Sequence, residues 1–157
     1  MKREYPDQPV VGVGGVVVRD GRALLIRRGG EPLKGQWSIP GGTLELGETI
    51  AQGVVRELRE ETGLEVRVLD LIEVFERISP STGSGDARPQ YHFVILDYLC
   101  AAPSGDAVAG SDVTHVAWAA EEELARYALT PTATRVVKAA LAMAHSIGKG
   151  KLEKEKG

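Results

Sequence analysis

The order of apolar segments along this chain of 157 residues predicts an α/β fold. Valine-rich segments of strand type recur along the chain, and segments with helical periodicity lie between and after them. Strands are expected at 10–19, 23–28, 66–77, 90–100 and 113–118, and helices at 50–62, 121–127 and 132–147. Because a chain of this length ordinarily folds as one domain, residues 1–147 are predicted to form a single domain. The charged residues 148–157 are predicted to form a disordered tail.

Composition and charge narrow the class of function. The formal net charge is −3, whereas a general nucleic-acid binder needs a basic surface for its phosphate contacts. No apolar run is long enough to cross a membrane, and the N-terminus lacks the pattern of a signal peptide. Cys100 is the only cysteine, so no intrachain disulfide can form. We therefore expect a cytoplasmic protein with no nucleic-acid partner and no membrane partner.

The first two predicted strands form a hairpin. Asp20-Gly21 is a strong turn signal between them. Side chains alternate along the return strand, so Arg27 and Arg28 lie on opposite faces and one of them should point inward or along the sheet. A planar guanidinium near an acidic helix suits a substrate phosphate. The alternative is a strand end that reaches solvent, and the alternation leaves both open.

The helix predicted from residue 50 carries three carboxylates within little more than one turn. Glu57, Glu60 and Glu61 fall within roughly 100° of its circumference. Like charges at this spacing destabilise a helix by about 0.2–0.5 kcal/mol per pair. Arg56 can reach Glu60 and offset part of this cost, and a divalent cation would offset more. Hard oxygen ligands favour Mg²⁺, for which Mn²⁺ can substitute; the alternative is a solvated acidic face.

Two positions near the start of this helix have competing interpretations. Thr49 and Gln52 predict a capping box, and Glu48 precedes it, where its charge either favours the helix dipole or assists a metal. Gly53 is predicted on the acidic edge, where a small residue leaves space for a bound metal–diphosphate or for the glycine loop packed over the helix. A tolerated glycine at a solvent position is the alternative. Alanine at this position is expected to raise stability slightly.

Asp97 is out of place in the otherwise apolar strand 90–100 unless it has a partner. It either joins the metal cluster from across the sheet or is satisfied by a backbone or arginine contact. Nothing in the pattern of the strand separates these two interpretations.

The spacing around the acidic helix resembles a known signature. Five residues separate Gly42 from Glu48, and seven more lead to Arg56-Glu57-Leu58, with Glu60-Glu61 and Gly63-Leu64 following after single residues. Over 42–64 the chain is similar, at every specified position, to the Nudix box of the Nudix hydrolases. The resemblance implies an α/β/α sandwich with a mixed β-sheet between helices. It also implies hydrolysis of a diphosphate linked to another moiety.

The resemblance and the residues together give the expected site. The carbonyl of Gly41 is implied as a metal ligand, and a phosphate-binding arginine near the end of the second strand favours Arg28. We expect catalytic roles for Glu57, Glu60 and Arg28, metal ligation by Gly41, Glu57, Glu60 and Glu61, and assisting or structural roles for Glu48, Arg56 and Asp97. The general base that deprotonates the attacking water is left open among Glu60, Glu57 and an acidic residue brought over from a loop.

The identity of the substrate has less support in the sequence than the class of reaction. Pro80, sixteen positions after Leu64, resembles the ADP-ribose-cleaving subgroup. A nucleoside-diphosphate sugar such as ADP-ribose is therefore the leading substrate. The alternative is pyrophosphohydrolysis of normal or oxidised nucleoside triphosphates, and a third interpretation is a non-catalytic nucleotide sensor, which the intact acidic cluster disfavours. The loop 78–89 is either a lid or a plain connection, and a homodimer is left open.

Overall fold

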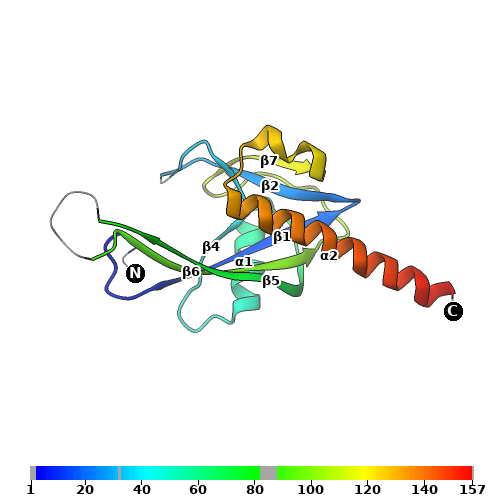
Figure 1. The fold of residues 1–157 in the computed structure, drawn as a ribbon, viewed down its shortest axis with the longest axis horizontal. Helices are drawn as coiled ribbons and strands as arrows, with labels where there is room; N and C mark the ends of the chain where they lie inside the picture. Colours follow the sequence, from blue (N-terminus) through cyan, green and yellow to red (C-terminus); the bar gives the residue numbers. More distant parts are fainter. Residues whose placement is uncertain (1–2, 32, 82–87, 157) are drawn as a thin grey trace.

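The computed structural model describes residues 3–31, 33–81 and 88–156, and Figure 1 shows its elements. Strands β1 (Val10–Arg19) and β2 (Arg22–Arg28) are followed by the short strands β3 (Trp37–Ser38) and β4 (Gly41–Thr43). Helix α1 (Ile50–Thr62) precedes the long strands β5 (Arg67–Ser79) and β6 (Tyr91–Ala101). Strand β7 (Val113–Ala119), the 3₁₀ helix η1 (Glu121–Tyr127) and helix α2 (Pro131–Lys156) complete the described chain.

Within the described residues, seven strands form one mixed sheet in the order β3-β2-β1-β6-β5, with β4 paired to β1 and β7 paired to β2. Strand β1 runs parallel to β6, and the other pairs are antiparallel. As predicted, β1 and β2 form a hairpin, with Asp20 and Gly21 at positive φ in the turn. These strands pair only next to that turn, and β4 takes the place of β2 farther along β1. The sheet therefore splits into two halves that diverge from the hairpin.

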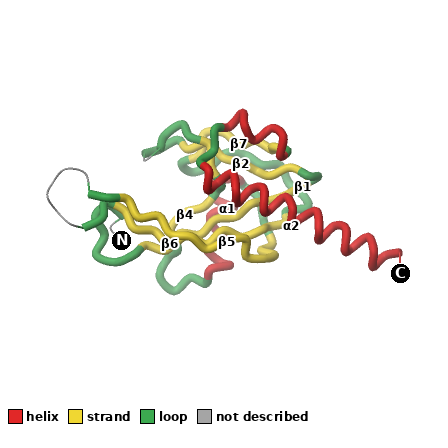
Figure 2. Tube along the Cα trace, in the orientation of Figure 1, coloured by secondary structure: helices red, strands yellow, loops and turns green. Residues whose placement is uncertain are grey.

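Two apolar clusters on opposite faces of the sheet hold the layers together. One consists of Val54 and Leu58 from α1 with sheet residues such as Val13 and Cys100. The other joins residues of α2 to the opposite face of the same strands, through Val16, Leu25, Leu99, Val136 and Val137. The two helices therefore lie on opposite sides of the sheet, as Figure 2 shows, and the expected α/β/α sandwich is confirmed.

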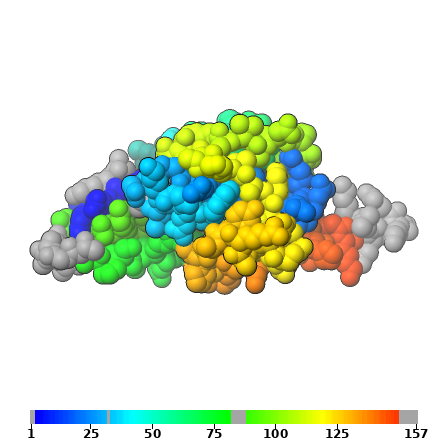
Figure 3. Space-filling model, turned by 90° about the horizontal axis from the view of Figure 1, so that it is seen from above, coloured from blue at the N-terminus to red at the C-terminus, as the bar shows by residue number. Residues whose placement is uncertain are grey.

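Several boundaries differ from the predictions. Strand β5 continues to Ser79, and its register shifts twice against β6, which accounts for its imperfect alternation. The predicted lid or connection at 78–89 falls partly outside the described residues. Helix α2 continues beyond Ile147 to Lys156, whereas the sequence predicts a helix that ends at residue 147 and a disordered tail after it. Figure 1 shows α2 continuing past the sheet toward the C-terminus, and the orange-red part of this helix lies near one end of the molecule in Figure 3. In the part of the chain that the structure describes, no helix is long and apolar enough to span a bilayer.

Candidate active site

The acidic helix begins and ends where its sequence predicts. The side chain of Thr49 accepts a hydrogen bond from the backbone N–H of Gln52, and the Gln52 side chain accepts one from the N–H of Thr49. Gly63 ends the helix in the left-handed conformation, with a φ of 73°. Buried Val54 and Leu58 anchor α1 on the sheet. This anchoring fixes which side of the helix carries its carboxylates.

Arg56 organises the first half of the acidic face. Its guanidinium donates to Glu48 at 2.6 Å, to Glu57 at 2.8 Å and to Glu60 at 3.4 Å, and it also donates to the Thr43 carbonyl at 3.1 Å. The predicted pairing of Arg56 with Glu60 is therefore present. The hydrogen bonds from Arg56 lower the pKa of Glu48. Glu48 consequently connects the loop before the helix to the centre of its acidic face.

Glu57 lies directly under the glycine turn. A Cβ atom at Gly42 would approach the Glu57 carboxylate to 2.5 Å, so only glycine permits this contact between turn and helix. Only 12% of the Glu57 side chain is exposed. This burial raises the pKa of Glu57, although Arg56 opposes the shift. Glu57 is thus a partly desolvated carboxylate whose pKa stays raised although Arg56 and Arg3 act to lower it.

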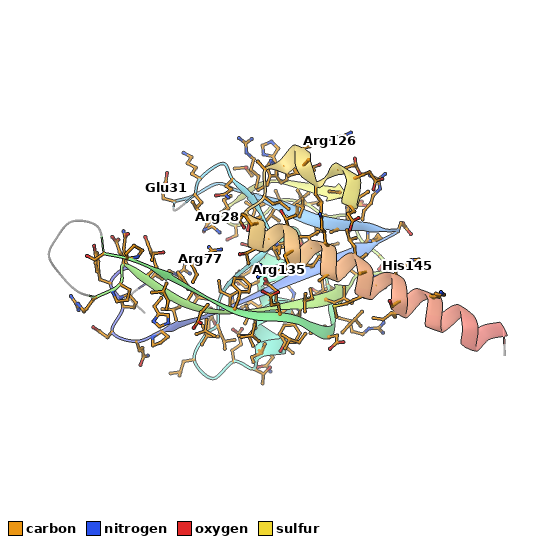
Figure 4. All side chains as sticks on the ribbon, in the orientation of Figure 1. Arg28, Glu31, Arg77, Arg126, Arg135 and His145 are labelled. Carbon is orange, nitrogen blue, oxygen red and sulfur yellow. The ribbon has the colours of Figure 1, made fainter. Side chains whose placement is uncertain are left out.

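Glu61 extends the site toward β2. It accepts a hydrogen bond from the Gly41 N–H at 2.8 Å. Burial raises the pKa of Glu61 to about 7, with Glu57 and Asp112 adding repulsion, while the Gly41 N–H and Arg28 act in the opposite direction. Arg28, predicted to hold phosphate, therefore lies within electrostatic range of the acidic cluster, and Figure 4 shows it at the end of β2.

Asp112 is an acidic residue that the spacing analysis did not single out. It belongs to the loop before β7, whose backbone is tied to the end of α1 by hydrogen bonds from Val108 to Thr62 and from Gly110 to Glu61. The Gly29 N–H donates to the Asp112 carbonyl at 2.6 Å. These contacts bring a loop carboxylate near Glu61, which periodicity within one helix cannot reveal. An acidic residue from a loop had been expected only as an unnamed alternative.

Gly53 does not lie on an open acidic edge. It is buried, and a Cβ atom there would meet Leu44 Cδ1 at 2.7 Å, Glu48 Oε1 at 3.1 Å and Val13 Cγ2 at 3.2 Å. Leu44 and Glu48 belong to the loop between β4 and α1, so the glycine accommodates that loop. The expectation that alanine would simply stabilise the helix is revised below, because its methyl group has no free space.

Asp97 lies on the opposite side of the sheet from α1. It has the same orientation along β6 as Leu99, which packs in the α2 cluster, whereas Cys100 packs against α1. The residue is only 4% exposed. Burial raises its pKa to about 6, with Glu73 repelling the charge and Arg77 attracting it. No hydrogen bond or ion pair to Asp97 occurs among the described residues.

The donor chemistry of the acidic helix fits a divalent cation. Carboxylate oxygens are the ligands that Mg²⁺ prefers, and partial burial raises the pKa of both Glu57 and Glu61. In residues 3–31, 33–81 and 88–156, however, no group of three or more such side chains is already arranged around a metal position. Arg56 binds Glu57 and Glu60, while Glu61 faces the Gly41 N–H, so the ligand assignments stay predictions.

Comparisons with known proteins agree with this architecture. An ADP-ribose pyrophosphatase of Methanocaldococcus jannaschii is 38% identical over 104 residues, which are 66% of this chain and 57% of that protein. This chain therefore spans little more than half of that relative. The nucleoside triphosphatase NudI of Salmonella newport is 32% identical over 76% of this chain and 87% of its own length.

A solved structure gives the same result for the fold. The crystal structure of a MutT NUDIX hydrolase from Burkholderia pseudomallei matches with a TM-score of 0.70 and 32% identity, over 84% of this chain and 98% of the other. The model of the NUDIX domain matches residues 8–140. These residues include the glycine turn, the acidic helix and the strands that position them. The chain therefore belongs to the Nudix family.

Proposed function

We propose that this protein hydrolyses a nucleoside diphosphate linked to another moiety, with an ADP-ribose-like nucleotide sugar as first substrate. The observation that carries this proposal is the partly buried carboxylate pair Glu57 and Glu61, which both contact the glycine turn. A diphosphate is itself anionic, so such a cluster can bind it only together with positive charge. Arg28 at the edge of the cluster and a divalent cation would supply that charge.

The residues of the chain divide the work of binding and positioning. Glu57, Glu60 and Glu61, with the Gly41 carbonyl, would hold Mg²⁺ or Mn²⁺. When bound, the cation would neutralise phosphate oxygens and lower the pKa of a water ligand. Arg56 keeps Glu57 and Glu60 in place through its hydrogen bonds, and Glu48 in turn holds Arg56. Glu48 and Arg56 therefore act as positioning residues.

Proton removal from the attacking water needs a carboxylate within hydrogen-bond reach. Glu57 and Glu60 are candidates on the helix, and Asp112 is the candidate from a loop. Arg28 would stabilise the negative charge on the departing phosphate. Variants of these three carboxylates, compared by the pH profile of kcat, would identify the base, because its removal abolishes the acidic limb.

The test is a panel of nucleotides incubated with purified protein and Mg²⁺, with identification of the products. Cleavage of ADP-ribose between its two phosphates should release AMP and ribose 5-phosphate. The similarity to the ADP-ribose pyrophosphatase of Methanocaldococcus jannaschii supports this substrate class. A chelator should stop turnover, and added Mg²⁺ should restore it. Full turnover in excess chelator would contradict the proposed dependence on a metal.

A second candidate is pyrophosphohydrolysis of nucleoside triphosphates, normal or oxidised. It is favoured by the similarity to NudI, because this chain covers 87% of that nucleoside triphosphatase. The products distinguish the candidates, since a triphosphate would release diphosphate and a nucleoside monophosphate. Nucleotide binding without any cleavage would favour the sensor alternative over both.

A further inference from the structure

Asp97 is a buried carboxylate for which the described residues supply no hydrogen-bond donor. Its exposure of 4% means that water satisfies little of its hydrogen-bonding capacity. No fully buried side-chain N or O atom of the described residues lacks a hydrogen-bond partner, so the Asp97 oxygens keep some contact with solvent. Arg77 attracts its charge without forming an ion pair with it. The proposed chemistry at α1 does not use this residue.

The surroundings of Asp97 contain a second oxygen acceptor and the bare backbone of a glycine. A Cβ atom at Gly14 would overlap Asp97 Oδ1 and would lie 3.1 Å from the carbonyl oxygen of Pro40. The Pro40 carbonyl accepts one hydrogen bond, from the Gly15 N–H at 3.1 Å, and keeps a second lone pair. Two oxygen acceptors thus converge above a backbone position that has no side chain. A group that binds between them must bring hydrogen-bond donors.

This acceptor pair is adjacent to the acidic cluster. The peptide unit between Pro40 and Gly41 contributes its carbonyl to the space above Gly14, and its N–H donates to Glu61 at 2.8 Å. Asp97 and Glu61 are therefore separated by the width of one peptide unit and lie on opposite sides of it. A ligand whose phosphates reach Glu61 is long enough to reach Asp97 with its nucleoside.

An aliphatic and two aromatic side chains continue from Asp97 along the same face of the β5–β6 hairpin. Ile95, Phe93 and Tyr91 follow at alternate positions of β6, and all three are partly exposed. The rings of Phe93 and Tyr91 are stacked, with centroids 6.1 Å apart and planes within 15°. Arg77 on β5 pairs with Phe93 and is exposed, and Figure 4 shows it on this hairpin, facing the side of Arg28. Such a row suits the face of a nucleobase, which stacks on aromatic rings.

We propose that Asp97 is a specificity-determining residue that accepts a hydrogen bond from the exocyclic amino group of a nucleobase stacked along Ile95 and Phe93. The inference rests on the proposed function, in which phosphates bind at α1. A carboxylate and a carbonyl repel the oxygen that hypoxanthine carries in place of the amino group of adenine. The site therefore selects adenine-type over hypoxanthine-type nucleotides.

The experiment compares kcat/KM for ADP-ribose and its hypoxanthine analogue, and in parallel for ATP and ITP. The wild type should prefer the amino-bearing member of whichever pair it cleaves by about tenfold or more, the value of one hydrogen bond to a charged group. Asp97→Asn offers a donor as well as an acceptor, so this preference should disappear or reverse. Glu76→Gln is the matched control: it neutralises an exposed carboxylate on the other face of the same hairpin and should keep the wild-type ratio.

Binding of AMP and IMP, measured by calorimetry, gives the same comparison without turnover. Equal affinity of the wild type for both would overturn the proposal, whatever the variants do. Loss of activity in Asp97→Asn with an unchanged base ratio would assign the residue a purely structural role and would also overturn it. A change in the response of Asp97→Asn to removal of a ribose hydroxyl, without a change in its base preference, would also overturn the proposal.

Two further results keep this inference separate from the proposed function. Cleavage of the triphosphate pair alone would refute the ADP-ribose assignment while still reporting the base ratio. Gly14→Ala places a methyl group where Asp97 Oδ1 lies, so the carboxylate must move, and binding of AMP should be reduced more than binding of IMP. A Gly14→Ala protein with the wild-type ratio would show that the position of this carboxylate does not set the base preference.

Discussion

The two ends of the acidic face on α1 differ in how their charge is compensated. At the Arg56 end, a single guanidinium binds Glu48, Glu57 and Glu60, and the pKa of Glu48 is lowered. At the Glu61 end, the carboxylate accepts a hydrogen bond from the Gly41 N–H alone among the described residues, and burial raises its pKa to about 7. The Arg56 end thus contains the positive charge that compensates its carboxylates, whereas the Glu61 end has no cation in hydrogen-bond contact among the described residues.

This difference suggests that the Arg56 end positions side chains, whereas the Glu61 end binds a cation. An arginine that forms several charge-assisted hydrogen bonds fixes its partners and satisfies them. A desolvated carboxylate with no cation in hydrogen-bond contact is destabilising unless a ligand supplies positive charge. We therefore expect changes at the Arg56 end to alter geometry and stability. Changes at the Glu61 end should alter metal dependence while leaving the fold intact.

The largest expected effect tests the carboxylates themselves. Glu57→Gln, Glu60→Gln and Glu61→Gln should each lower kcat by roughly 10²–10⁴-fold, the range associated with lost proton transfer or charge stabilisation. Glu65→Gln is the matched control, because Glu65 is exposed, pairs with Arg59 and follows the same helix. Steady-state kinetics across Mg²⁺ concentrations would measure the effect. A Glu61→Gln protein with wild-type kcat and metal dependence would remove the proposed difference between the two ends.

The next effect concerns packing at the Arg56 end. Gly53→Leu places a large side chain where even a Cβ atom is crowded by Leu44, Glu48 and Val13, so it should destabilise the protein by about 3 kcal/mol or more and disturb Glu48. Gly53→Ala gains helix propensity of about 1 kcal/mol but must displace Leu44, so the net change should be within about 1 kcal/mol of zero. Thermal melts of both variants measure this difference. A Gly53→Leu protein as stable as the wild type would show that the loop does not pack on the helix.

A smaller effect should follow when Arg56 can no longer donate hydrogen bonds to Glu48 and Glu57 together. Arg56→Lys keeps the positive charge but cannot bind Glu48 and Glu57 together, because an ammonium group lacks the planar geometry of the guanidinium. We expect a loss of about 1–2 kcal/mol in stability and roughly tenfold in kcat. Arg59→Lys, on the exposed side of the same helix, should change neither quantity. Equal effects of the two substitutions would indicate that only net charge matters at Arg56.

The sequence predicts local features of this molecule better than contacts between distant segments. The Asp20-Gly21 turn and the capping box of Thr49 and Gln52 each depend on residues within a few positions, and both are present. The order of the acidic residues along α1 likewise follows from helical periodicity. The helical extension of α2 to Lys156 was missed because a charged, glycine-containing sequence has no apolar pattern to mark it.

The remaining features depend on how separate segments meet. Gly53 was placed on the acidic edge because a helical wheel does not show which loop covers it, and Leu44 comes from outside the helix. Asp112 reaches Glu61 through hydrogen bonds between a loop and the end of α1. The orientation of Asp97 depends on the parallel pairing of β1 with β6, which no local pattern specifies. Periodicity predicts which residues share one face of a helix or strand. The contacts between separate segments can be predicted only once the topology of the sheet is known.

The smallest expected effect is a dependence of stability on pH, which distinguishes Glu61 from Glu48. The folded pKa of Glu61, about 7, exceeds its ordinary value of 4.5, so the native state holds more protons than the unfolded state between these values. Stability should then decrease as the pH rises through this range. Asp97, with a pKa of about 6 against 3.8, should act in the same direction over a lower range. Glu48 has a lowered pKa, so its contribution is lost only on acidification below its ordinary value.

Thermal melts without divalent metal, from about pH 5 to about pH 7.5, would measure this dependence as a fall of roughly 1 kcal/mol, or about 2–4 °C in Tm. The Glu61→Gln variant should lose part of the slope, while Glu65→Gln should keep all of it. Saturating Mg²⁺ should flatten the slope of the wild type, because a bound cation favours the ionised carboxylate. If Glu61→Gln retains the wild-type slope in metal-free buffer, Glu61 is already compensated in the folded protein. The two ends of the acidic face would then be electrostatically alike.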